Sequence, residues 1–169
     1  MAIADQSKGH AMIVRFTDQA EIDQLAKIWY DGWQDAHATI LPVELARVRT
    51  FESFRERLQK ALPNVRVVGE PGQPIGFSIV KGDELYQLYV SAASRGLGVA
   101  ALLVADAEVR LRESGVNTAW LACAIGNERA ARFYEKCGWH RVGNMVNPLE
   151  TPDGIFPLEV WRYEKTLAL

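Results

Sequence analysis

The amino-acid sequence predicts a mixed α/β (α+β) fold with a sheet of about seven strands and about four helices. Two observations support this class. Short segments rich in β-branched and aromatic residues alternate with longer segments in which apolar residues recur every three to four positions. A glycine-containing loop, SRGLG at residues 94–98, joins one such strand to one such helix. The 169 residues are enough for one domain with a substantial core.

The first half of the chain predicts a strand, two helical regions and three further strands. Residues 12–16 (MIVRF) alternate as a strand does, and Thr17 or Asp18 can cap the helix that follows. Pro42 opens a second helical region, which ends by Pro63. The apolar positions of the two helical regions are Ile22, Leu25, Ala26, Ile28, Trp29 and Trp33, then Phe51, Phe54 and Leu58. The strands expected next are residues 65–70, 74–82 and 84–90.

The second half predicts two helices, each placed after a strand. The first begins at Leu97 and ends at Gly115; after a buried strand at residues 118–124, the second ends at Gly138. Their apolar faces are Val99, Leu103, Ala107 and Leu111, then Ala130, Phe133, Tyr134 and Cys137. Exposed i, i+4 ion pairs are expected from Asp106 to Arg110 and from Glu108 to Arg112. Two strands, 139–146 and 158–167, close the chain around a loop that holds Pro148, Pro152, Gly154 and Pro157.

Composition excludes several classes of function. The formal net charge of −2 gives no reason to expect binding to nucleic acid or to an anionic membrane. No apolar run approaches the roughly 20 residues that span a bilayer. Cys123 and Cys137 lack metal-ligand spacing, so we expect a reduced, cytoplasmic protein without a metal site. Residues 1–11 lack the apolar segment of a signal peptide and are expected to form a flexible tail before a single domain at 12–169.

The loop of Arg95, Gly96 and Gly98 has the features of an anion site. The first amides of a helix have no intrahelical acceptor, and glycines allow a phosphate to approach them closely. A plain turn is the alternative. A Walker A loop is excluded, because Val99 and Ala100 stand where lysine and Ser or Thr are needed. The dinucleotide pattern G-x-G-x-x-A fits residues 96–101 poorly, because SAASR separates the strand from the first glycine.

Two motifs together resemble those of the GCN5-related N-acetyltransferase (GNAT) family. Arg95, Gly98 and Ala100 fill the pattern R-x-x-G-x-A of that family's pyrophosphate loop. Residues 127–139 (NERAARFYEKCGW) are similar to its N-x-x-A-x-x-F-Y-E-K-x-G-[FW] segment. The resemblance is strong over residues 84–143 and looser toward both ends.

The resemblance implies a sheet whose fourth and fifth strands splay apart to admit acetyl-CoA as cosubstrate. Pantetheine is then expected to pair with backbone groups near Leu88 and Val90. The pyrophosphate is expected on the amides of Gly96, Leu97, Gly98, Val99 and Ala100. Arg95 either adds charge there or is a solvated loop arginine. Asn127 either caps the helix after it or contacts the cofactor arm, and the two roles are compatible.

The resemblance also implies the chemistry, which is transfer of an acetyl group to a primary amine by direct attack in a ternary complex. Tyr134 is the expected general acid for the departing thiolate, although its position also fits core packing. Glu84 matches the position of the base in some members, with a water chain or a solvated edge carboxylate as the alternatives. Cys123 and Cys137 fit packed thiols better than a ping-pong nucleophile.

The acceptor is left open by the sequence. Trp29, Trp33 and His37 lie on one helical face; Trp29 fits the core, whereas Trp33, Asp35 and His37 are candidates for an aromatic and acidic pocket that holds a cation. The acceptor could be a small-molecule amine or a protein N-terminal or lysine amine, and a homodimer is also open. The alternative to an enzyme is an acyl-CoA sensor or a catalytically inactive interaction protein of the same fold.

Overall fold

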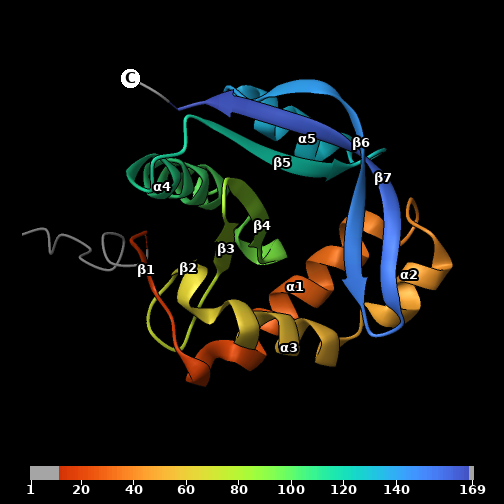
Figure 1. The fold of residues 1–169 in the computed structure, drawn as a ribbon. Helices are drawn as coiled ribbons and strands as arrows, with labels where there is room; N and C mark the ends of the chain where they lie inside the picture. The colour runs from red at the N-terminus through yellow and green to blue at the C-terminus, as the bar shows by residue number, and fades with distance from the viewer. Residues whose placement is uncertain (1–11, 168–169) are drawn as a thin grey trace, which may run out of the picture.

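A seven-stranded mixed sheet, in the order β1-β2-β3-β4-β5-β7-β6, organises the computed structural model, which describes residues 12–167 (Figure 1). Neighbouring strands are antiparallel except β4 and β5, which are parallel. The strands are β1 (Val14–Phe16), β2 (Val65–Val68), β3 (Gly76–Lys81), β4 (Glu84–Val90), β5 (Thr118–Ala124), β6 (His140–Thr151) and β7 (Gly154–Thr166). The helices are α1 (Ile22–His37), α2 (Val43–Val48), α3 (Phe51–Ala61), α4 (Val99–Glu113) and α5 (Glu128–Lys136). The tail predicted at residues 1–11 lies outside the described residues.

Residues 12–167 contain five α-helices where the sequence predicted about four, because the region after Pro42 contains two helices. The chain leaves the helical conformation at Arg49 and Thr50, between α2 and α3. The Thr50 side chain then accepts a hydrogen bond from the Ser53 amide at 3.1 Å and caps α3. In the sequence, the break between the two helices is indicated by Thr50, a capping residue that lies between the apolar positions of α2 and those of α3.

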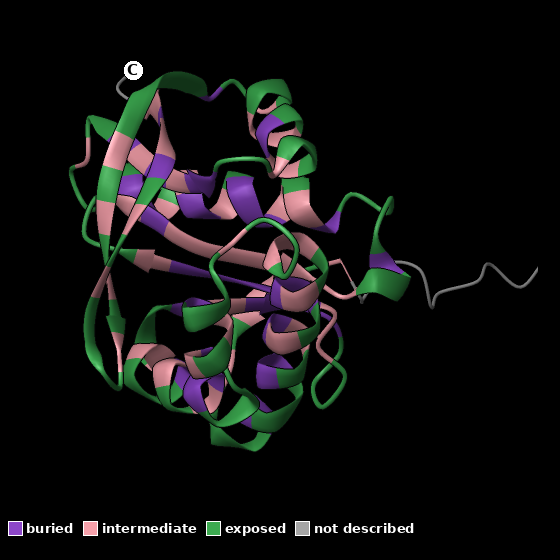
Figure 2. Cartoon of the chain, turned by 90° about the vertical axis from the view of Figure 1, so that its right-hand side faces the viewer, coloured by how far each residue is buried: buried purple, intermediate pink, exposed green. Residues whose placement is uncertain are grey.

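The helices lie on both faces of the sheet, and the core fills the spaces between the layers (Figure 2). On one face, α1 and α3 bury Trp29, Phe54 and Leu58 against β2 and β3. On the other, α4 packs against the same sheet through Val99 and Leu103. The predicted apolar stripe of α4 is therefore correct. The ion pair from Asp106 to Arg110 forms, at 3.7 Å, but it is partly buried rather than exposed. The pair from Glu108 to Arg112 is wrong: Glu108 pairs with Lys165 of β7, and Arg112 donates to the Leu167 carbonyl.

Strands β6 and β7 form one long hairpin where the sequence predicted a loop at residues 147–157. Their pairing continues to Thr151 and Gly154. Pro148 stands directly opposite Pro157. Two facing prolines can be accommodated at a position of an antiparallel ladder that exchanges no hydrogen bonds, which is why they do not end the strands. The far end of the hairpin packs Leu149 and Phe156 against the core that also contains α1 and α3.

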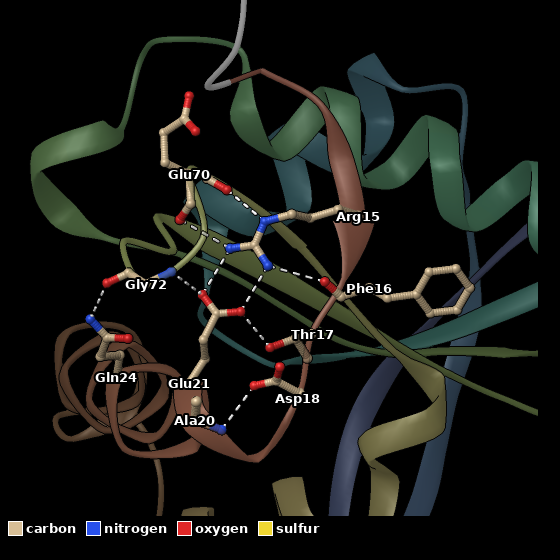
Figure 3. Close-up of polar contacts among 10 residues, drawn as sticks. Arg15, Phe16, Thr17, Asp18, Ala20, Glu21, Gln24, Glu70 and Gly72 are labelled. Carbon is tan, nitrogen blue, oxygen red and sulfur yellow. Dashed lines mark hydrogen bonds and ion pairs between the residues drawn. The ribbon is translucent and has the colours of Figure 1, made fainter.

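A polar cluster fixes the entry to α1 (Figure 3). The Arg15 guanidinium donates two hydrogen bonds to the Glu21 carboxylate, both at 2.8 Å, and a third to the Gly69 carbonyl. Glu21 also accepts from the Thr17 hydroxyl and the Gly72 amide, and its pairing with Arg15 lowers the pKa of its carboxyl. This cluster ties β1, the start of α1 and the β2–β3 turn together.

Candidate active site

Strands β4 and β5 part immediately after they meet (Figure 1). Their only paired residues are Glu84 and Trp120. On the other side of β4 the register with β3 shifts, so that Tyr86 is an extra residue in the ladder. Such a bulge bends a strand and increases its twist. The predicted splay between the fourth and fifth strands is confirmed, and the bulge gives it a physical cause.

The divergence leaves one edge of β4 unpaired at the positions predicted to matter. The Ser91 amide donates to the Ile75 carbonyl, so Ser91 turns its backbone polar groups toward the β3 side. Because these directions alternate along an antiparallel strand, Leu88 and Val90 turn theirs toward the gap. Their backbone groups can therefore accept an additional extended ligand.

The loop before α4 presents a row of free amides. Gly96 and Gly98 have φ values of 80° and 82°, and a Cβ built on either meets no atom within 4 Å. Among the described residues, none of the amides of residues 96–101 has a hydrogen-bond acceptor. The positive φ at both glycines and the N-terminal end of the helix dipole make this a cradle that suits a pyrophosphate.

Arg95 joins this loop to α1 rather than standing alone in solvent. Its guanidinium pairs with the Asp35 carboxylate at 2.9 Å. Arg95 still lines the cavity described next, whereas Asp35 does not. The expectation of Asp35 as a carboxylate for an acceptor cation is therefore wrong, because this side chain faces the loop arginine.

A single cavity of about 540 Å³ joins the divergent strands to the space beneath α1 and the β6–β7 hairpin. The predicted residues that line it are Glu84, Leu88, Val90, Arg95, Gly96, Gly98, Val99, Ala100, Asn127, Tyr134, Trp33 and His37. Leu97 is the exception, because its side chain is 63% exposed and is not part of the cavity lining. Asn127 accepts a hydrogen bond from the Ala130 amide at 3.3 Å, so its role as the cap of α5 is confirmed while it also lines the cavity.

Tyr134 lies on α5 between the core and the cavity. Its ring contacts those of Phe133, Trp139 and Tyr163, with centroids 5.3 to 6.5 Å apart. Burial raises the pKa of its phenol above the ordinary value, so the group keeps its proton at neutral pH. No described residue forms a hydrogen bond with its hydroxyl, which leaves that proton available to a group inside the cavity.

Glu84 begins β4 at the point where the strands part. Burial raises the pKa of its carboxyl to about 7, and the charge of Asp83 acts in the same direction. Lys81 and Arg162 offset part of that increase. A carboxyl with this pKa exchanges its proton near neutral pH, which suits a general base.

Comparison with known proteins identifies the family. The sequence profile of the acetyltransferase (GNAT) family matches residues 22–139. The chain belongs to this family. It is 30% identical over 130 residues to the peptidyl-lysine N-acetyltransferase YjaB of Escherichia coli K12, an alignment that covers 77% of this chain and 83% of YjaB.

Solved structures of GNAT proteins share the fold. A GCN5-related N-acetyltransferase from Rhodopseudomonas palustris superposes with a TM-score of 0.72 at 20% identity, covering 92% of this chain and 96% of that one. The PaiA N-acetyltransferase from Thermoplasma acidophilum, solved with coenzyme A, gives 0.64 at 17% identity, covering 91% and 98%. The predicted family and fold class are thus both confirmed.

The acceptor end of this GNAT domain differs from the sequence expectation. Trp33 is buried beside His37, with ring centroids 5.5 Å apart. Burial lowers the pKa of His37 to about 4, and its Nδ1 has no hydrogen-bond partner among the described residues. Arg49 and Arg57 line the cavity, whose other charged lining residues are Glu84, Arg95 and Arg129. The expected acidic pocket for a cation is therefore replaced by a cationic one.

Sequence reasoning missed both arginines, although each left a signal. Arg49 follows the buried Leu45 by four residues, and Arg57 lies three residues after the buried Phe54. A charged residue that continues the buried face of a helix requires a partner or a cavity. Here the cavity appears only once α2, α3 and the β6–β7 hairpin come together.

Proposed function

We propose that this GNAT protein transfers an acetyl group from acetyl-CoA to a primary amine, by direct attack of the amine in a ternary complex. The observation that carries the proposal is the convergence on one cavity of an unpaired strand edge, a cradle of free amides, a protonated phenol and a carboxyl that titrates near pH 7.

The cavity fits coenzyme A in its chemistry. The amides around Gly96 and Gly98 would hold the pyrophosphate, and Arg95 adds positive charge beside them. The edge groups of Leu88 and Val90 would pair with the amides of pantetheine. When bound, acetyl-CoA supplies an acetyl thioester, the activated acyl group that the reaction requires. The coenzyme A in the PaiA structure supports this assignment by family likeness.

Two residues would move protons. Glu84, in its carboxylate form, accepts the proton of the incoming ammonium or of the attacking amine. Tyr134 donates its phenolic proton to the leaving sulfur, so that a thiol departs rather than a thiolate. The nitrogen forms the new bond to the acyl carbon, and the bond from that carbon to sulfur breaks.

A cysteine nucleophile is not favoured. Burial raises the pKa of Cys123 to about 12 and also raises that of Cys137, so both are thiols at neutral pH. The Cys123 thiol lies 3.9 Å from the Ala124 carbonyl and 3.8 Å from the Asn127 carbonyl, without a basic partner. A ping-pong route would need a thiolate that this site does not favour, whereas direct transfer to the amine needs no cysteine.

The test is thiol release from acetyl-CoA in the presence of a panel of primary amines. Turnover with at least one amine, above hydrolysis without it, is expected. Coenzyme A should also raise the melting temperature, because it binds the folded state, and NAD should do so less. Coenzyme A binding without thiol release from any amine would favour the sensor function, and tighter binding of NAD would overturn the coenzyme A site.

A further inference from the structure

Two arginines meet at the acceptor end of the cavity. Arg49, between α2 and α3, is only 4% exposed. Its Nη1 donates to the Glu150 carbonyl of the hairpin at 3.0 Å. Arg57, on α3, donates to the Tyr86 hydroxyl at 2.8 Å and lies 4.4 Å above the ring of Trp29. Both guanidiniums line the cavity that also contains Glu84 and Tyr134.

Neither guanidinium has a carboxylate partner among the described residues. Within residues 12–167 no salt bridge includes Arg49 or Arg57, whereas Arg15, Arg55, Arg95 and Arg162 are all paired with acids. The two arginines also repel each other, and burial together with this repulsion lowers the pKa of Arg49 to about 10, at which it is still charged at neutral pH. A buried charge without a counter-ion is costly, so a site that keeps the buried Arg49 beside the half-buried Arg57 is arranged for an anion.

Glu84, which supplies the one carboxylate among the described residues that line the cavity, is not that anion. The charges that act on Glu84 are those of Lys81, Asp83 and Arg162, and neither Arg49 nor Arg57 is among them. Among the described residues, no ion pair joins Glu84 to either arginine, so the arginine pair is not neutralised by the base. One molecule could place an amine at Glu84 and an anionic group at the arginines.

We propose that the acceptor is a small amine that also bears an oxyanion, first of all a carboxylate as in a free amino acid, and that Arg49 and Arg57 bind this group. The inference rests on the proposed N-acetyltransferase function and names its substrate class. Arginine suits this task because its planar fork forms paired hydrogen bonds with a carboxylate or a phosphonate. Neutral His37 and the buried Trp33 add an aromatic wall without a competing charge.

This site differs from what a lysine side chain of a protein would need. A peptidyl lysine has an amine at the end of an alkyl chain and no carboxylate of its own on that chain. The unpaired arginines would then remain without a counter-ion in the complex. A bifunctional small molecule satisfies the amine site and the arginine site together.

The test uses matched acceptors that differ only in the anionic group. Acetyl transfer to α-, β- and γ-amino acids is compared with transfer to their carboxamides and to aminoalkylphosphonates of equal length. We expect at least one carboxylate or phosphonate acceptor to exceed its carboxamide by ~10- to 100-fold in kcat/KM, the range for hydrogen bonds to charged groups. The carboxylate and phosphonate arms separate the two kinds of oxyanion.

Substitution then assigns the preference to the arginines. Arg49→Gln and Arg57→Gln should each remove most of it through KM, whereas Arg57→Lys should retain part. The matched control is Arg47→Gln, because Arg47 is exposed on α2 and lies outside the cavity. Coenzyme A affinity and melting temperature are measured for every variant, and Arg49→Lys replaces Arg49→Gln if the latter does not fold.

The outcomes distinguish the inference from the function on which it rests. Equal rates with carboxamides and carboxylates, or preference for a lysine peptide, would overturn the inference and leave the acetyltransferase function intact. No thiol release from any amine would refute that function. The arginine site is then tested by calorimetric titration with N-acetyl amino acids and their amides, and equal binding of both would overturn it as well.

Discussion

At the scale of single residues, substitution of Tyr134 best distinguishes a catalytic role from a packing role. Tyr134→Phe removes one oxygen and keeps the ring contacts with Phe133, Trp139 and Tyr163. If the phenol is the general acid, kcat should fall by ~10²- to 10⁴-fold while coenzyme A affinity changes little. Steady-state kinetics with the best amine and calorimetry with coenzyme A measure the two quantities. Full activity in the variant would leave Tyr134 as a core residue only.

Glu84 makes a prediction about pH. Because burial raises the pKa of its carboxyl to about 7, the carboxylate needed as a base is lost as the pH falls through 7. The profile of kcat/KM should therefore have an acidic limb centred near pH 7 rather than near 4.5. Glu84→Gln should lower kcat by ~10²-fold or more and remove this limb. An unchanged limb in the variant would assign the base to another group, such as a water chain.

Sequence motifs placed Tyr134, Asn127 and the loop glycines in the cavity because each lies within a short, contiguous pattern. Arg49 and Arg57 could not be placed in this way. Their side chains face a space that exists only between two helices and a hairpin about a hundred residues farther along the chain, as the bond from Arg49 to the Glu150 carbonyl shows. The apolar pattern of a helix predicts which of its residues are buried, but it does not predict which residues of other elements lie against them.

At the scale of elements, alternation and helical spacing predicted all seven strands and most of the core faces of the helices. They did not predict the buried Leu45 and Ala131, and the predicted Phe51 is 39% exposed. The errors fell where tertiary pairing overrides a local signal. Prolines at 148 and 157 indicate a loop, yet they face each other in a paired hairpin. Tyr86 is part of an unbroken strand pattern, yet its bulge in β4 opens the cavity. Register depends on the partner strand, which a single segment does not contain.

The glycine loop can be tested as an element with a control on the same helix. Gly98→Val adds a side chain at φ 82°, in the space where an anion would approach the amides of α4. Gly115→Val does the same at φ 92°, in open space beyond the other end of α4. Both should lose roughly 1–2 kcal/mol of stability from the left-handed backbone. Only Gly98→Val should weaken coenzyme A binding, by ~10-fold or more in calorimetry; equal affinity in both would make the loop a turn only.

At the scale of the whole molecule, two groups of the same cavity oppose each other in the dependence of stability on pH. Burial lowers the pKa of His37 to about 4, so between pH 4 and 6.5 the unfolded chain binds a proton that the folded protein does not. This makes stability rise with pH. Burial raises the pKa of Glu84 to about 7, so between pH 4.5 and 7 the folded protein binds a proton that the unfolded chain does not. This makes stability fall with pH, and the two slopes cancel where the windows overlap.

Substitution of either group should therefore leave only the other group's contribution to the pH dependence of the unfolding free energy. Between pH 4.5 and 6.5, Glu84→Gln should become more stable as the pH rises, because only His37 is left, and His37→Gln should become less stable. Each slope approaches at most about 1.4 kcal/mol per pH unit, the value for one proton, while the parent protein changes little over this range. Urea unfolding at several pH values measures all three. Slopes of the same sign in the two variants would contradict the assignment, because folding would then have to favour the charged form of one group and the neutral form of the other. A steep slope in the parent would show that groups outside the cavity dominate.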